Sequence, residues 1–259
     1  MDSLVLIFKT WSLGLLFLLV LQYLVFLYAY RKKRIDIIDV FWGLSFVMVC
    51  LIYAIINISN LNIASYVVFL CITIWGLRLS SHIFVRFKSR REQDERYTYI
   101  TKSFIKNPIL VYIKVFAVQA FLASMVTMVF LSATLSSKYN PFLLFVGLII
   151  WLFGIAYESI ADMQLKNNIA NKAGSLMKTG LWKYSRHPNY FGELVQWLAI
   201  WLMVSGGEFA VAGLVGPLTI YILILFVSGI PPLEKHMASK KGWEDYKEST
   251  SIIVPWWRL

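Results

Sequence analysis

Seven long apolar runs constrain this chain more than any other feature. They fall at roughly residues 4–30, 36–57, 62–84, 109–135, 141–165, 189–205 and 209–231. Each is about long enough to cross a hydrocarbon core of roughly 30 Å as a helix. With 59% hydrophobic residues and a mean hydropathy of +0.66, they exclude a soluble globular domain. We therefore predict an all-α, polytopic membrane bundle of about seven helices, forming a single domain over residues 1–259.

The positive charges predict how this bundle is oriented. Of the 25 lysines and arginines, 21 lie in the segments 31–34, 86–106, 166–186 and 235–258, which follow the first, third, fifth and seventh runs. The connections after the other runs contain only Lys138. The positive-inside rule then places the N-terminus outside and the C-terminus in the cytosol. The net charge of +11 is explained by topology, and no nucleic-acid partner is expected.

The two cysteines carry no further prediction. Cys50 and Cys71 both fall inside apolar runs, where a thiol behaves as a small packing residue. Their spacing matches neither a disulfide framework nor a metal site. We therefore assign no metal ligand in this chain.

A polar, basic run leads into the sixth apolar segment and is the first candidate site. It reads Gly180-Leu-Trp-Lys-Tyr-Ser-Arg-His-Pro-Asn-Tyr-Phe-Gly-Glu193. Pro188 suits the first turn of a helix, so the N–H groups of that helix start, with Lys183 and Arg186, suit a phosphate. Asn189 and Glu193 are one helical turn apart. An amide and a carboxylate so placed can recognise a carboxamide, one by accepting and one by donating.

Two other spans have polar ends. Glu158 and Asp162 are like charges at i, i+4, which disfavour a helix unless a cation or a hydrogen-bond donor lies between them, and they suit ribose hydroxyls or an adenine amine. Asp39 lies inside the second span, where either a functional role or a structural ion pair explains it. Arg78 is positioned to pair with Asp39, to bind an anionic ligand group, or to snorkel to the interface.

These residues share one predicted side of the membrane. Ten ionisable side chains fall at cytosolic span ends: Asp39, Arg78, His82, Glu158, Asp162, Arg186, His187, Glu193, Glu234 and His236. The pattern predicts a cavity open to the cytosol for a soluble charged cofactor, with a hydrophobic substrate supplied by the membrane. The loop 86–106 is interpreted as solvated, or as a lid carrying Tyr97 and Tyr99. The tail 240–259 is interpreted as an interfacial segment anchored by Trp256 and Trp257.

Four motifs, in this order along the chain, resemble one known family. They are Asp39-Val-Phe-Trp-Gly43, Trp75-Gly-Leu-Arg78, the run 180–193, and Trp243-Glu-Asp-Tyr246 with Val254-Pro255. The chain resembles the uncharacterised-domain branch of the steroid 5-alpha-reductase-like family. The characterised relatives in that family are multi-helix membrane enzymes that use NADPH to reduce a carbon–carbon double bond conjugated to a ketone. The resemblance implies that Asn189 and Glu193 hold the nicotinamide end of NADPH. It also places Asp162 and His236 near the cofactor.

The resemblance and the residue pattern together give a full set of site assignments. The predicted cofactor-binding residues are Arg78, Glu158, Asp162, Lys183, Arg186, His187, Asn189, Tyr190, Glu193 and His236. The predicted catalytic acid is Asp39 or Tyr97. Where the steroid reductases place a Glu on the second span and a Tyr on the third, this chain has Asp39 and Trp75, so the lipophilic substrate is not assumed to be a steroid.

Two other functions stay open. The core Arg-His-Pro-x-Tyr-x-Gly at residues 186–192 is also similar to isoprenylcysteine carboxyl methyltransferases, which bind S-adenosylmethionine at such a sequence. The pair Asn189 and Glu193 and the pair Glu158 and Asp162 fit the reductase pattern better. A non-enzymatic lipid-binding membrane protein is the third possibility, and the oligomeric state is not predicted.

Overall fold

The structure is a computed structural model that describes residues 2–90, 92–171 and 175–256. Over these residues the chain is helical, without a strand, and a β-bridge joins Ser185 to Ser251. Six of the described helices are long and apolar enough to cross a membrane: Ser3–Lys32, Ile35–Ile56, Ile63–Ser89, Pro108–Val126, Pro141–Ile169 and Ala210–Met237. The prediction of an all-α, multi-pass membrane protein is therefore confirmed.

The chain divides into two compact units, which we describe one at a time. The first unit comprises Met1–Asn140 and Val204–Gly216, and the second comprises Pro141–Met203 and Pro217–Leu259. Each contains helices of membrane-spanning length. The single domain over residues 1–259 stays a prediction.

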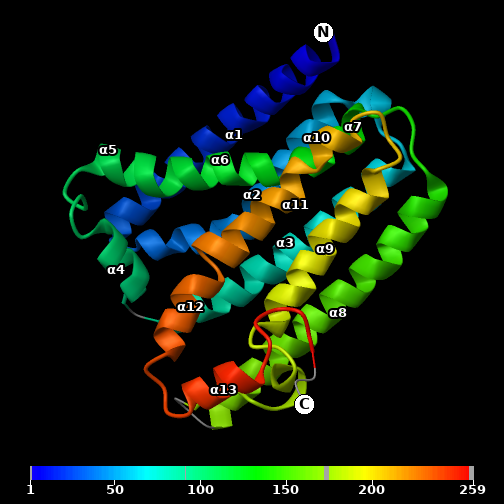
Figure 1. Cartoon of the computed structure of the whole chain (residues 1–259). Coiled ribbons are helices and arrows are strands. Elements are labelled where there is room, and N and C mark those ends of the chain that lie inside the picture. The colour runs from blue at the N-terminus through cyan, green and yellow to red at the C-terminus, as the bar shows by residue number, and fades with distance from the viewer. Residues whose placement is uncertain (1, 91, 172–174, 257–259) are drawn as a thin grey trace. The chain divides into compact units, whose positions relative to one another are not determined.

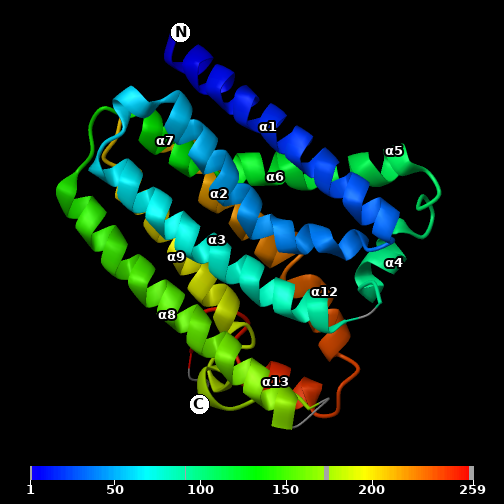
Figure 2. The same cartoon turned by 180° about the vertical axis from the view of Figure 1, so that it is seen from behind.

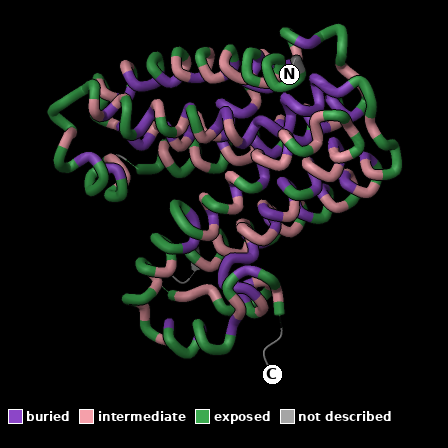
Figure 3. Tube along the Cα trace, turned by 45° about the horizontal axis from the view of Figure 1, so that its top comes forward, coloured by how far each residue is buried: buried purple, intermediate pink, exposed green. Residues whose placement is uncertain are grey.

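The first unit combines long helices with shorter helical segments (Figures 1 and 2). Its elements, with 3-10 and π segments written η, are α1 (Asp2–Lys32), η1 (Ile35–Ile37), α2 (Ile38–Ile56), η2 (Ile58–Asn60), α3 (Ile63–Ser89), α4 (Glu95–Thr101), α5 (Pro108–Val111), η3 (Tyr112–Ala117), α6 (Val118–Val126), α7 (Met128–Leu135) and α10 (Ala210–Gly213). Along the helix that begins at the N-terminus, most residues are exposed or intermediate and few are buried (Figure 3). Exposed apolar side chains such as Phe8 and Leu24 are what a lipid-facing helix requires.

Two glycines set the contact between α2 and α3. A Cβ added to Gly76 would lie 2.7 Å from the carbonyl oxygen of Gly43, and one added to Gly43 would overlap the carbonyl oxygen of Gly76. Small residues allow membrane helices to approach closely, because packing replaces the hydrophobic effect there. The Trp-Gly pairs noted in the sequence therefore bring the two spans together, with Trp75 buried beside Phe46.

The predicted fourth span, 109–135, is interrupted. It begins at Pro108, continues as the π segment η3, and its α-helix breaks at Thr127 between α6 and α7. The Thr127 hydroxyl donates to the carbonyls of Ala123 and Ser124, a local bond that competes with the regular helical pattern. Hydropathy alone does not reveal this break, because the residues on both sides are apolar.

The second unit is organised around α8 (Pro141–Asn171) and α9 (Pro188–Val204), and it also contains η4 (Gly180–Lys183), α11 (Val215–Ile222), η5 (Leu223–Val227), α12 (Ile230–Met237) and α13 (Trp243–Ser249). Glycine again sets the helix contact. A Cβ on Gly192 of α9 would lie 2.7 Å from the carbonyl oxygen of Gly154 and 2.7 Å from the backbone nitrogen of Glu158. This close approach makes hydrogen bonds between polar side chains of α8 and α9 possible.

The C-terminal segment packs against the run 180–187. Tyr246 Oη donates to the carbonyl of Trp182 at 2.6 Å, Arg186 N donates to the carbonyl of Ser251 at 2.8 Å, and Ser185 Oγ donates to that of Ile253 at 2.7 Å. Trp243 and Tyr246 are buried, whereas Val254 and Trp256 are exposed. The predicted anchor residue Trp257 lies outside the described residues. The interfacial role of the tail 240–259 stays a prediction.

Candidate functional site

The strongest candidate site in the second unit is the α8–α9 seam, which we define as Glu158, Asp162, Asn189 and Gln196. Asn189 Nδ2 donates to Asp162 Oδ1 at 3.2 Å, and Gln196 Nε2 donates to Glu158 Oε2 at 2.6 Å. Each carboxylate of the i, i+4 pair on α8 thus faces an amide from α9. The expectation that hydrogen-bond donors must accompany two like charges is confirmed.

The seam has more acceptors than its own donors satisfy. Asn189 Oδ1 and Gln196 Oε1 are buried atoms that accept no hydrogen bond among the described residues. Reversing either amide would put its oxygen against a carboxylate, so the assigned orientation is the favourable one. A buried acceptor without a partner is costly, and it is normally satisfied by a water or by a ligand donor. The geometry therefore suits a ligand group that donates hydrogen bonds, such as a carboxamide, a hydroxyl or an amine.

Two further predicted cofactor residues lie on the first turns of α9. Glu193, one turn after Asn189, is half-buried. Tyr190 is also half-buried, and its ring stacks on His187 with centroids 5.8 Å apart and planes 25° apart. The predicted polar face of this helix is thus present, and Gln196 extends it by one further turn.

Arg186 is bound inside the protein. Its Nε donates to Glu234 Oε1 at 2.8 Å, and its Nη1 donates to the carbonyls of Lys247 at 2.9 Å and Thr250 at 2.6 Å. The guanidinium also lies 5.7 Å from the ring centroid of Trp243. We call Arg186, His187 and Glu234 the Arg186 anchor. The predicted contact between Arg186 and phosphate gains no support from this geometry, whereas Lys183 is exposed.

His187 is neutral in this environment. Burial lowers the pKa of its imidazole from 6.5 to about 4, although the Glu234 carboxylate opposes the shift. Its Nε2 lies 3.3 Å from Glu234 Oε1, a contact in which a neutral imidazole donates if the proton is on Nε2. The other predicted histidine, His236, is exposed on α12.

In the first unit, the structure brings together the two predicted candidate acids, from segments 58 residues apart in the sequence. Tyr97 Oη donates to Asp39 Oδ1 at 2.5 Å, Arg96 Nη2 donates to Asp39 Oδ2 at 2.9 Å, and Gln119 Nε2 donates to Tyr97 Oη at 3.3 Å. We call Asp39, Arg96, Tyr97 and Gln119 the Asp39 cluster. Burial and the Asp39 carboxylate raise the pKa of the Tyr97 phenol well above its usual value of 10. Tyr97 therefore keeps its proton at physiological pH.

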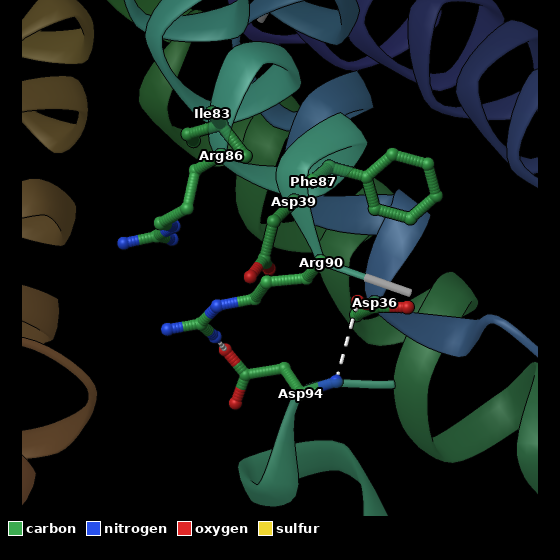
Figure 4. Close-up of a pocket in the computed structure, with 7 residues that line it drawn as sticks. All are labelled: Asp36, Asp39, Ile83, Arg86, Phe87, Arg90 and Asp94. Atoms are coloured by element: carbon green, nitrogen blue, oxygen red, sulfur yellow. Dashed lines mark hydrogen bonds and ion pairs between the residues drawn. The ribbon is translucent and has the colours of Figure 1, made fainter. Parts of the chain in front are cut away.

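A small cavity adjoins this cluster (Figure 4). It is lined by Asp36, Asp39, Ile83, Arg86, Phe87, Arg90 and Asp94, and its volume of about 10 Å³ is close to that of one water molecule. Two ion pairs lie beside it: Arg90 Nη1 with Asp94 Oδ2 at 2.8 Å, and Arg34 Nε with Asp36 Oδ1 at 2.9 Å. The cavity is too small for a cofactor.

Other predictions on the first unit have mixed outcomes. The loop 86–106 is partly helical, and its two tyrosines differ, because Tyr97 is buried and Tyr99 is 82% exposed. Arg78 is half-buried on α3, and His82, one turn later, is exposed. Pairing of Arg78 with Asp39 stays a prediction. The sequence did not predict that Arg96 would bind Asp39 or that Gln119 would bind Tyr97. Neither residue lies at a helical spacing from Asp39, so no periodic pattern connects them.

A comparison with known protein families identifies the group to which this chain belongs. Residues 25–251 match the model of a family described as a protein of unknown function, DUF1295. The chain is a member of that family. The match includes both the Asp39 cluster and the α8–α9 seam. No curated protein and no solved structure matches the chain.

Proposed function

We propose that this DUF1295 protein is a membrane-embedded reductase that uses NADPH to reduce the carbon–carbon double bond of a lipophilic enone. The observation that carries the proposal is the buried oxygen Asn189 Oδ1, which accepts no hydrogen bond among the described residues. The amide nitrogen of the same side chain already donates to Asp162. An amide oxygen held in this way is complementary to the N–H group of a nicotinamide carboxamide.

The residues of the second unit fit NADPH best at its nicotinamide end. Asn189 and Glu193 would hold the carboxamide, while the carboxylates of Glu158 and Asp162 would accept from ribose hydroxyls. Because Arg186 is occupied by Glu234 and two carbonyls, we assign the phosphates to exposed lysines such as Lys183 and Lys166. NADPH, when bound, supplies the hydride for such a reduction.

The reaction also needs a proton, which we assign to the Asp39 cluster. Hydride addition to one alkene carbon moves the π electrons towards the ketone oxygen, and the other alkene carbon then takes a proton. Tyr97 is protonated at neutral pH, and Asp39 and Gln119 orient its hydroxyl. In this structure the single phenol proton is donated to Asp39, so we propose that the ketone oxygen of the substrate replaces the Asp39 carboxylate as the acceptor, and the phenol then donates a hydrogen bond to the developing oxyanion.

The proposal includes a specific membrane topology. We propose seven crossings, with α9 as the sixth, the N-terminus outside and the C-terminus and cofactor site facing the cytosol. The asymmetric distribution of lysine and arginine supports this orientation. At 17 residues, α9 is at the short end of the range for a membrane-spanning helix.

The test is a thermal-stability titration of the detergent-solubilised protein with NADPH and with S-adenosylmethionine. A ligand at about 100 times its Kd stabilises the folded state by about 2.7 kcal/mol. We expect NADPH to stabilise the wild type, and the Asn189→Ala and Glu193→Gln variants to lose most of that response. Asn167→Ala, which changes an exposed asparagine of α8, is the matched control.

Each other outcome has a defined meaning. Stabilisation by S-adenosylmethionine alone would favour a methyltransferase, because an acceptor-rich seam also suits the amine and the hydroxyls of that cofactor. A normal NADPH response in both Asn189→Ala and Glu193→Gln would refute the site assignment. A response to neither ligand would favour a non-enzymatic, lipid-binding role.

A further inference from the structure

A group of three lysines lies outside both candidate sites. Lys102, Lys106 and Lys114 are exposed and lie between the end of α4 and the π segment η3. We call them the lysine corner. The sequence from residue 102 to 114 contains no aspartate or glutamate, so the corner carries three positive charges. Figures 1 and 2 show this part of the chain beside the end of α1.

Lys114 is in an unusual position for a charged residue. It is exposed, six residues inside the membrane-spanning segment Pro108–Val126, or about 9 Å along the helix axis. A lysine facing lipid at this depth is unfavourable unless its ammonium reaches the headgroups or a counter-charge. Its Nζ lies 4.8 Å from the centroid of the Phe104 ring. The side chain is therefore directed back towards the turn that carries Lys102 and Lys106.

Three arginines of the first unit are neutralised within the protein. Arg34 pairs with Asp36, Arg90 pairs with Asp94, and Arg96 pairs with Asp39 and Asp94. By contrast, no acidic side chain of the described residues pairs with a lysine of the corner. An uncompensated group of three cations at a membrane boundary attracts an anion from outside the chain.

The backbone of the corner is fixed. Tyr30 Oη, near the end of α1, donates to the carbonyl of Ile105 at 3.2 Å. Asn107 Oδ1 accepts from the backbone nitrogens of Ile109 and Leu110, so the first N–H groups of α5 are already satisfied. The positive charge offered to a ligand thus comes from the lysines and not from the helix end.

We propose that the lysine corner binds an anionic phospholipid. The phosphate pairs with Lys106 and Lys114, and the acyl chains lie along Ile109 and Ile113, which are 68% and 49% exposed. This apolar surface beside the cations favours a lipid over a soluble phosphate. The inference does not depend on the reductase proposal, because no residue of the corner belongs to either candidate site.

The experiment measures lipid affinity by native mass spectrometry, with the full-length protein in neutral detergent and phosphatidylglycerol or phosphatidylcholine added. Each lysine near a phosphate contributes about 1 kcal/mol, or about fivefold in affinity. We expect Lys114→Gln to weaken phosphatidylglycerol binding about fivefold, the variant with all three lysines changed to Gln to weaken it further, and Lys114→Arg to preserve it. Added salt should reduce the preference for the anionic lipid.

Two controls make the result specific. Lys9→Gln removes another exposed lysine, on α1, about 30 Å along the helix from Tyr30, and should leave phosphatidylglycerol binding unchanged. Equal affinity for the two lipids, or an equal loss in Lys9→Gln and Lys114→Gln, would overturn the proposal. So would competition by inorganic phosphate at a concentration similar to that of the lipid, because the site would then recognise the anion alone.

Discussion

At the scale of single residues, the buried imidazole of His187 makes stability depend on pH. In the unfolded chain a histidine takes up a proton as the pH falls through about 6.5. In the folded protein the pKa is about 4. Between these values the unfolded state binds more protons, so stability falls as the pH falls from about 6.5 to about 4.

This difference gives a measurable prediction. At pH 5, His187 should reduce the free energy of unfolding by about 2 kcal/mol relative to neutral pH. We expect His187→Gln to show a shallower loss of stability than the wild type between pH 7 and pH 5, as measured by thermal unfolding in detergent. His236→Gln, which changes an exposed histidine, is the control and should follow the wild type. If His187→Gln also follows the wild type, the imidazole is not held neutral.

The sequence predicted several residues of the candidate site, but it did not predict all of their partners. Helical spacing predicted that Glu158 and Asp162 share a face of one helix and that Asn189 and Glu193 share a face of the next. The structure places amides of α9 against both carboxylates of the first pair. Arg186 was assigned to phosphate because it lies before a helix start, yet its partner Glu234 is 48 residues later. Only the tertiary fold determines such a distant pairing.

At the scale of elements, glycine determines how closely the spans pack. The hydrogen bonds of the α8–α9 seam form only if the two helices lie close together. They can do so because Gly192 has no Cβ at the point of contact. The π segment η3 and the break at Thr127 were not predictable from hydropathy, because an apolar run has the same mean hydropathy whether or not its helix is regular. Span positions were predictable, but their internal irregularities were not.

The glycine contact can be tested directly. Gly192→Ala places a methyl group 2.7 Å from backbone atoms of α8, and backbone cannot yield as a flexible side chain can. Overpacking of this kind costs about 1–3 kcal/mol, so the melting temperature in detergent should fall. Leu198→Ala, at a position of α9 that is 46% exposed, is the comparison and should change it less. Equal melting temperatures for Gly192→Ala and the wild type would show that α8 and α9 do not pack this closely.

At the scale of the whole molecule, charge and hydropathy predicted a multi-pass helical membrane protein. Both quantities depend only on which residues occur in each segment of the chain. They leave one span undecided. Six described helices satisfy length and apolarity together, while α9 has 17 residues and begins with the polar face of the candidate site. Whether α9 crosses the membrane decides whether the chain has six crossings or seven.

The positions of the two termini answer this question, because an odd number of crossings puts them on opposite sides of the membrane and an even number puts them on the same side. Single cysteines can be introduced by Ser3→Cys and Ser249→Cys, both at exposed positions, and the native Cys50 and Cys71 are buried. In intact cells, a membrane-impermeant maleimide should label Ser3→Cys, whereas Ser249→Cys should react only after the membrane is permeabilised.

Labelling of both in intact cells, or of neither, would mean an even number of crossings and would remove α9 from the membrane. Labelling of Ser249→Cys alone would keep seven crossings but reverse the orientation, and the cofactor site would then face away from the cytosolic NADPH that the proposed reaction needs.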